Sequence, residues 1–211
     1  MITVHHLSSS RSERIVWLLE ELGVAYQLDW HQREANRAAP TAMADIHPIG
    51  KAPIISDAGL VLAESGAIVE YILRRYAGGR LVPAPDSPQL PRYLYWLHFA
   101  EGSLMSLMLI ALVLSRVPES KDSPVRARIG ARMTQMLSFC DGELAENEYF
   151  AGPEFTAADV MMVFPFTTMR RYLDYDIAPY ANIVEYVKRI EARPAYRRAM
   201  SIAGPDARAP G

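Results

Sequence analysis

The chain has 211 residues, half of them hydrophobic, which is enough to bury the core of one domain or two. Its formal net charge of −2 gives none of the basic surface that nucleic-acid binding requires. A single cysteine excludes an intrachain disulfide framework and cysteine-based metal clusters, which fits a reducing compartment such as the cytoplasm.

The first thirty residues predict a strand, a helix and a second strand. Residues 2–7 form the first strand, and a serine-rich polar turn leads into a helix with apolar residues from Ile15 to Leu22. Gly23 ends this helix, and residues 26–30 form the second strand. Strand, helix and strand in this order are typical of a parallel pair with a right-handed crossover.

The stretch 47–76 predicts a loop, a β-hairpin and a helix. The loop 47–53 must be shaped rather than helical, because its two prolines fix φ and its glycine can adopt positive φ. The short apolar runs 54–55 and 60–62 are separated by a Ser-Asp-Ala-Gly turn, so they read as a hairpin. A helix then opens at 63–66 and continues to Tyr76. The polar segment before the loop carries at most a short irregular helix.

The composition changes after this helix. Glycines and prolines crowd the segment up to Pro91, which we interpret as a linker, and strand signals are absent beyond it. The helices that we expect there cover residues 92–117, 125–147, 157–171, 183–192 and 194–202. Thr156 and Asp159 fit a capping box at the start of the third of these helices. We therefore predict an α/β domain at 1–78, a linker at 79–91 and an all-helical domain at 92–211.

Four segments resemble the cytosolic glutathione S-transferase family, and the resemblance spans nearly the whole chain. They are HHLSSSRSERIVWLLEELGV, HPIGKAP, AESGAIVEYI and FTAADVMMVFPF. The first is similar to bacterial members that use a serine. The chain departs from the family at His47, where many members have Asn, and at Ala52, where many have Val. The resemblance implies a thioredoxin-like domain (β-α-β-α-β-β-α), an all-helical domain with a hydrophobic acceptor site, and a homodimer.

A serine hydroxyl is the group that the resemblance implies for activating glutathione. Lowering a thiol pKa by about two units requires about 2.7 kcal/mol, whereas a hydrogen bond to a charged group contributes about 1.5 to 3 kcal/mol and a helix N-terminus about 0.3 to 1 more. One hydroxyl at the first helix therefore suffices. The family pattern favours Ser10 as the catalytic residue, with Ser9 as the close alternative. Ser10 could instead only cap the helix, because Ser10 to Glu13 also fits a capping box.

The binding residues for glutathione are expected in the loop and at the following helix start. The helix N-terminus at Ser65 suits the carboxylate of the γ-glutamyl residue, and Glu64 can pair with its ammonium. A cis peptide between Ala52 and Pro53 would present an edge to the cysteinyl backbone, and Lys51 could reach the glycine carboxylate. The alternatives are that Ser65 is an ordinary N-cap, that Glu64 is a first-turn charge and that Lys51 is simply solvated.

The sequence gives weaker evidence for an acceptor pocket, a metal site or a nucleophilic cysteine. The methionines and aromatic residues of the helical region either line an acceptor pocket or pack in the core, and core packing is favoured for most. His5 and His6 point to opposite faces of a strand and lack further ligands in the sequence, so we expect no metal. Cys140 lies within a helix, which favours an inert thiol over a nucleophile.

The function expected from this reading is transfer of the glutathione thiolate to small hydrophobic electrophiles. Two alternatives stay open: glutathione-dependent peroxide reduction or isomerisation at the same site, and a non-catalytic binding or regulatory protein with this fold. The start of the chain lacks the features of a signal peptide, and its longest uninterrupted apolar run, 107–114, is far shorter than the roughly 20 residues of a membrane helix. We expect a cytoplasmic protein with no nucleic-acid or membrane partner.

Overall fold

The computed structural model describes residues 1–209 and divides into two compact units. One comprises residues 1–82 together with the C-terminal residues from 191 onward, and the other comprises residues 83–190.

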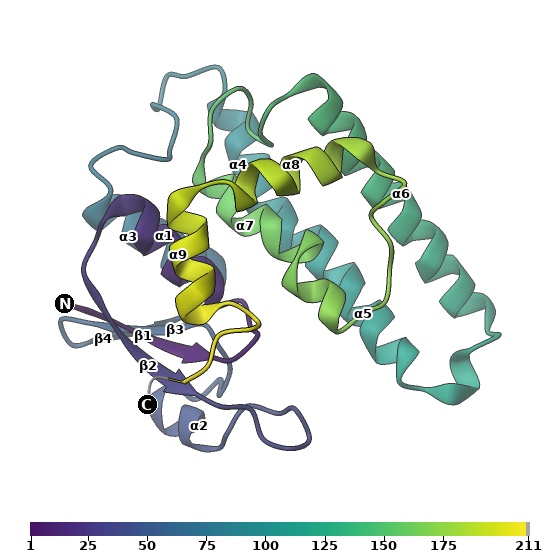
Figure 1. Cartoon of the computed structure of the whole chain (residues 1–211), viewed down its shortest axis with the longest axis horizontal. Helices are drawn as coiled ribbons and strands as arrows, with labels where there is room; N and C mark the ends of the chain where they lie inside the picture. The colour runs from purple at the N-terminus through teal and green to yellow at the C-terminus, as the bar shows by residue number, and fades with distance from the viewer. Residues whose placement is uncertain (210–211) are drawn as a thin grey trace. The chain divides into compact units, whose positions relative to one another are not determined.

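The first unit is built on a four-stranded sheet with the strand order β2-β1-β3-β4 (Figure 1). The strands are β1 (Ile2–Leu7), β2 (Tyr26–His31), β3 (Ile54–Asp57) and β4 (Leu60–Ala63). The pair β1 and β2 is parallel, whereas β3 runs antiparallel to both β1 and β4. The predicted crossover pair and hairpin are thus confirmed.

Three helices complete the thioredoxin-like pattern. They are α1 (Glu13–Leu22), the short α2 (Ala42–Ile46) and α3 (Ser65–Tyr76). Figure 1 shows α1 and α3 on one face of the sheet and α2 on the other. The helix α1 ends where predicted, because Gly23 adopts a left-handed conformation with φ of 63° and donates its N–H to the last turn. The predicted fold class of this domain is confirmed.

The last helix, α9 (Pro194–Ala203), packs against α1 in this first unit, as Figure 1 shows. Trp17 and Tyr196 meet edge to face with ring centroids 4.9 Å apart, and Arg193 binds Glu21 with two contacts of 2.7 and 2.9 Å. The predicted division differs here, because it assigned all of 92–211 to the helical domain. Pro194 starts a new helix whose buried apolar face finds its partner about 180 residues earlier in the chain, which no local pattern encodes.

The second unit is all-helical, as predicted. Its helices are α4 (Leu90–Phe99), a π-helix (Ala100–Met105), α5 (Ser106–Ser115), a 3-10 turn (Pro118–Ser120), α6 (Pro124–Glu146), α7 (Ala157–Phe166), a second 3-10 turn (Thr168–Arg171) and α8 (Ala181–Glu191). The single helix expected over 92–117 is therefore interrupted by a π-helical segment, where the Ser106 hydroxyl donates to the carbonyl oxygen of Glu101 at 2.7 Å. The helix expected over 157–171 ends early, just after Pro165 inside it.

The capping box at the start of α7 is confirmed, and its carboxylate is fully buried. The Asp159 side chain accepts hydrogen bonds from the backbone N–H of Thr156 at 2.9 Å and that of Phe150 at 3.0 Å. It also accepts from the Tyr186 hydroxyl at 3.2 Å. Burial raises the pKa of Asp159 to about 6, although these hydrogen bonds oppose the shift. One carboxylate thus joins the helix start, the preceding loop and α8.

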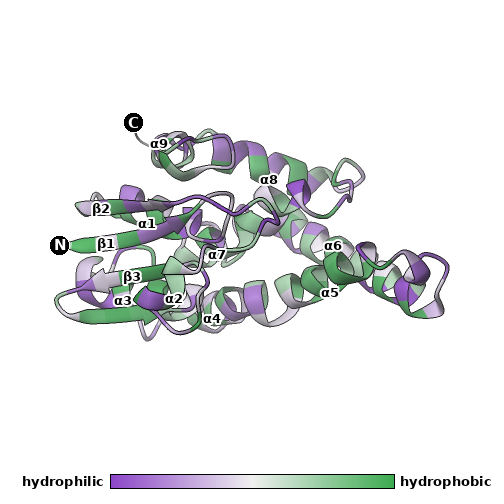
Figure 2. Cartoon of the chain, turned by 90° about the horizontal axis from the view of Figure 1, so that it is seen from below, coloured by the Kyte–Doolittle hydropathy of each residue, from purple (hydrophilic) through white to green (hydrophobic). Residues whose placement is uncertain are grey.

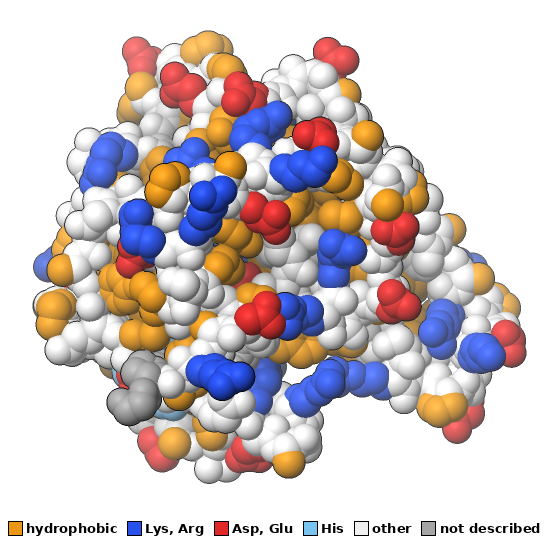
Figure 3. Space-filling model, viewed as in Figure 1, with side chains coloured by type: hydrophobic (Ala, Val, Ile, Leu, Met, Phe, Trp, Pro, Cys, Tyr) orange, Lys and Arg blue, Asp and Glu red, His pale blue; other side chains and the backbone are white. Residues whose placement is uncertain are grey.

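The surface of the helical unit is unevenly apolar. Helix α5 is hydrophobic along its length in Figure 2, and its side chains Ile110 and Val113 are exposed. By length and composition the continuous helical stretch Leu90–Ser115 is apolar enough to cross a membrane. A core helix of a soluble protein passes the same test, so this finding alone does not assign it to a membrane. Acidic and basic side chains are interspersed over the face shown in Figure 3.

Candidate functional site

The sheet topology brings the predicted site residues of the first unit to one edge of the sheet. Because β3 is antiparallel to β1 and β4, its first residue lies beside the end of β1 and the end of β4. Leu7, Ile54 and Ala63 accordingly share one buried cluster, against which Ala52 packs. The serine turn after β1, the proline loop before β3 and the helix start after β4 therefore converge, although Ser10 and Pro53 are 43 positions apart in the sequence.

The serine turn, residues 8–12 between β1 and α1, is held by hydrogen bonds at its start and at its end. The Ser10 side chain is buried, and its Oγ lies 2.7 Å from the Oγ of Ser12 and accepts from the backbone N–H of Ser12 at 3.2 Å. On the other side, the Arg33 guanidinium donates to the carbonyl oxygen of Ser8 at 2.9 Å. Helix α1 begins at Glu13, and Ser12, the residue before it, makes no side-chain capping hydrogen bond. Ser10 Oγ instead accepts the Ser12 N–H at this helix start, so a capping role for Ser10 is compatible with the predicted catalytic role.

A buried histidine, which sequence reasoning assigned no role, continues this chain of hydroxyls. His6 Nδ1 lies 2.8 Å from the Oγ of Ser12, and its ring packs on Trp30 with centroids 4.5 Å apart. Burial, together with the charges of His31 and Arg33, lowers the pKa of His6 to about 4, so its ring is neutral at pH 7. The alternation of the strand was the available signal, because it places His6 on the face that α1 covers.

The direction of these hydrogen bonds follows from the neutral ring. The Nε2 atom of His6 is buried without a hydrogen-bond partner among the described residues, and a buried N–H left unpaired is costly. We therefore assign the proton to Nδ1, which donates to the Ser12 hydroxyl. The Ser12 hydroxyl can donate to Ser10 Oγ at 2.7 Å or to the carbonyl oxygen of Leu7 at 3.4 Å, and we assign its hydrogen to the shorter contact with Ser10. Since Ser10 Oγ also accepts from the Ser12 N–H, the Ser10 hydrogen is left to donate to a ligand.

The loop and the helix start have the geometry that the sequence predicted, with one difference. The Ala52-Pro53 peptide is cis, and Gly50 adopts a positive φ of 57°. Helix α3 begins at Ser65, which is buried, while the residue at the N-cap position is Glu64. The alternative that Ser65 is the N-cap is therefore wrong.

Glu64 stands out at this helix start. Its φ is 75°, a conformation that residues with a side chain rarely adopt, and it makes no side-chain capping hydrogen bond to α3. Its carboxylate is exposed, as is the side chain of Lys51. The edge therefore combines a helix N-terminus with one exposed negative and one exposed positive charge.

Other candidates from the sequence have structural roles. The residues considered for an acceptor pocket are all buried in the helical unit: Tyr93, Trp96, Met105, Met108, Met161 and Met162. Their burial favours core packing. Cys140 is also buried, and burial raises the pKa of its thiol well above the usual range, so it is not a thiolate at neutral pH.

The comparisons with known proteins agree over most of the chain. Residues 1–74 match the family described as "Glutathione S-transferase, N-terminal domain", and residues 104–194 match "Glutathione S-transferase, C-terminal domain". Among curated proteins, the chain is 39% identical over 212 residues to glutathione S-transferase 3 of Schizosaccharomyces pombe, which covers 94% of this chain and 86% of that protein. It is 28% identical over 216 residues to glutathione S-transferase 1 of Saccharomyces cerevisiae, covering 93% and 92% of the two chains.

Solved structures show the same similarity. A glutathione S-transferase from Actinobacillus pleuropneumoniae has a TM-score of 0.88 and 35% identity, and the match covers 98% of this chain and 95% of that one. A sphingomonad glutathione S-transferase complexed with glutathione has a TM-score of 0.78 and 26% identity, covering 96% and 98%.

Proposed function

Because the chain belongs to the cytosolic glutathione S-transferase family, we propose that it is an enzyme that binds glutathione at the sheet edge and transfers its thiolate to small hydrophobic electrophiles. The observation that carries the proposal is the convergence of the Ser10 hydroxyl, the cis-proline loop and the start of α3 at one edge. The sphingomonad relative, whose structure contains glutathione, supports glutathione as the co-substrate.

Glutathione would be held by groups that match its chemistry. The N-terminus of α3 at Ser65 offers N–H groups and a partial positive charge to the carboxylate of the γ-glutamyl residue, while Glu64 pairs with its ammonium. The backbone of Ala52, before Pro53, pairs with the cysteinyl residue as one strand with another. Lys51 binds the glycine carboxylate. Each charge of the tripeptide thereby has a partner.

Ser10 is the group proposed to activate the sulfur. Its hydroxyl hydrogen is not used by Ser12, and Ser10 is only 6% exposed, so a bound thiolate would accept this hydrogen bond with little competition from water. His6 and Ser12 act as positioning residues, because they supply the donors that turn the Ser10 hydrogen toward the ligand. The activated thiolate then attacks the electrophile and displaces its leaving group.

The proposal also covers the domain division, the subclass, the assembly and the cellular location of the protein. Residues 1–78 form the glutathione-binding domain, 79–91 the linker, and the helical residues 92–190 carry the acceptor site for the electrophile. The subclass is the serine type, the assembly is a homodimer, and the location is cytoplasmic. No metal is required for this reaction.

Retention on immobilised glutathione, followed by a conjugation assay with a generic aryl halide, tests the function. We expect the purified chain to be retained, to elute with free glutathione and to form the aryl conjugate. Retention without conjugation would favour peroxide reduction or isomerisation at the same site. Absence of retention would contradict the proposal and favour a non-catalytic binding or regulatory protein.

Replacing Glu64 by alanine should weaken glutathione binding about tenfold or more, because a hydrogen-bonded charge pair contributes about 1.5 to 3 kcal/mol. The melting temperature should change little, since the side chain is exposed and makes no capping hydrogen bond. Calorimetric titration with glutathione and thermal unfolding measure the two effects.

Glu70→Ala is the matched control on the same helix, because Glu70 pairs with Arg74 one turn away on the helix surface at 3.2 Å. It should leave the affinity for glutathione unchanged. A loss of stability in Glu64→Ala without a loss of affinity would refute the binding role of Glu64.

A further inference from the structure

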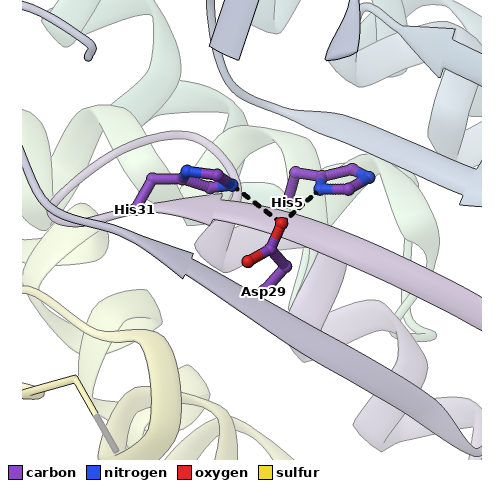
Figure 4. Close-up of side chains that lie close together, drawn as sticks. All are labelled: His5, Asp29 and His31. Carbon is purple, nitrogen blue, oxygen red and sulfur yellow. Dashed lines mark hydrogen bonds and ion pairs between the residues drawn. The ribbon is translucent and has the colours of Figure 1, made fainter. Parts of the chain in front are cut away.

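A second cluster of polar side chains lies on the sheet face opposite His6. His5 is on β1, and Asp29 and His31 are on β2. His5 pairs with Asp29 in the parallel register, and alternation along β2 places His31 on the same face as Asp29. Figure 4 shows both imidazole rings turned toward the one carboxylate.

The two imidazole rings contact the same oxygen atom of the Asp29 carboxylate. Asp29 Oδ2 lies 2.8 Å from His5 Nδ1 and 3.0 Å from His31 Nε2, and the candidate ligand atoms of the three residues lie within 4.8 Å of one another. Hydrogen bonds and charge from His5 and His31 hold the pKa of Asp29 below its usual value, although burial raises it. No residue of this cluster belongs to the proposed glutathione site.

The expectation of no metal rested on His5 having no further ligands, and the fold supplies two. Two imidazole nitrogens and a carboxylate oxygen are the donor set that suits Zn²⁺ and its neighbours in the first transition row. We propose that His5, Asp29 and His31 bind a divalent transition-metal ion of the Zn²⁺ type, with a fourth position open to water.

The three side chains must shift to accept the ion. Ligand atoms at about 2.1 Å from a tetrahedral Zn²⁺ lie roughly 3.4 Å apart, so the two contacts of Asp29 at 2.8 and 3.0 Å must lengthen by about half an ångström. The Asp29 side chain is 46% exposed, which leaves it room to move and gives the ion a path from solvent. The two rings are more enclosed but must also move closer together, because the ligand atoms lie up to 4.8 Å apart, whereas two nitrogens bound to one ion at about 2.1 Å are at most about 4.2 Å apart.

Ser56 on β3 supplies the outer contact that metal-binding histidines usually have. Its Oγ lies 2.8 Å from His5 Nε2. When Nδ1 of His5 binds the ion, the ring proton resides on Nε2 and donates to this hydroxyl, which orients the ring. Without the ion, the Ser56 hydroxyl donates to Nε2 instead, so one serine serves both states.

The test uses the full-length chain without an affinity tag, titrated calorimetrically with Zn²⁺ and, separately, with Co²⁺ followed by visible absorption. We expect one ion per chain and a Co²⁺ spectrum of tetrahedral type. His31→Asn and Asp29→Asn should each weaken binding at least tenfold, and Ser56→Ala about tenfold. Zn²⁺ should raise the melting temperature of the native chain but not that of His31→Asn.

His98→Asn is the matched control, because His98 is exposed on α4 in the other unit. It should leave the one-to-one binding unchanged. Circular dichroism of each variant shows whether it is folded before titration. The proposal fails if the native chain binds no ion, in which case the cluster is only a hydrogen-bonded network, or if folded His31→Asn and Asp29→Asn bind as well as the native chain.

Discussion

Ser10→Ala is expected to lower kcat/KM for aryl halide conjugation at least tenfold while leaving the fold intact. The variant removes the one hydrogen bond proposed to reach the thiolate, and a tenfold loss corresponds to about 1.4 kcal/mol, within the range for hydrogen bonds to charged groups. The pKa of bound glutathione, followed by thiolate absorption, should rise in the same variant. Steady-state kinetics and that titration measure the two consequences.

Two neighbouring serines provide the comparison. Ser9→Ala should have little effect, because the Ser9 hydroxyl points to the carbonyl oxygen of Pro205 at 3.5 Å. Ser12→Ala should give an intermediate loss in kcat, since it breaks the link between His6 and Ser10. Unchanged activity in Ser10→Ala, with a loss in Ser9→Ala, would move the catalytic role to Ser9.

Asp159→Ala is expected to lower the free energy of unfolding by about 3 kcal/mol. The variant leaves the buried N–H groups of Phe150 and Thr156 without their side-chain acceptor, and each such loss costs about 1 to 3 kcal/mol. It also removes the contact of the Tyr186 hydroxyl with this carboxylate. For a chain of this size the melting temperature should fall by roughly 6 to 12 °C. Urea unfolding and thermal unfolding measure this change, and a loss below 1 kcal/mol would contradict the role of the capping box.

The same carboxylate should make stability depend on pH in a defined direction. Its pKa is raised to about 6 in the folded chain, above the ordinary value of about 3.9, so the folded state binds more protons between these values. The stabilisation of the folded chain that comes from protonating Asp159 is therefore fully present below about pH 4 and is lost as the pH rises through 6.

Asp159→Asn removes this titration, so the stability of the native chain relative to that variant should grow as the pH is lowered from 7 to 4. Asp122→Asn, at an exposed position of the helical unit, should show no such trend. A difference that shrinks as the pH is lowered would show that the hydrogen bonds outweigh burial at Asp159.

Much of the fold was predictable because its signals are local. The hairpin from Ile54 to Ala63 follows from two apolar runs around an Asp-Gly turn, and the capping box at Thr156 follows from a three-residue spacing. The cis peptide before Pro53 was also predicted, on the resemblance of its loop to a known family. The family itself is confirmed, whereas the catalytic and binding residues remain predictions that the experiments above test.

The sequence by itself thus determined the order of elements, the two kinds of domain and the family, because turns, caps and apolar periodicity act over a few residues. Only the tertiary structure decided which distant groups meet. Parallel pairing of β1 and β2 brings Asp29 and His31 to His5, and packing under α1 joins His6 to Ser12. The partner of α9 was likewise set by long-range contact. Such long-range contacts depend on strand register and on how the helices pack, which local sequence patterns do not specify.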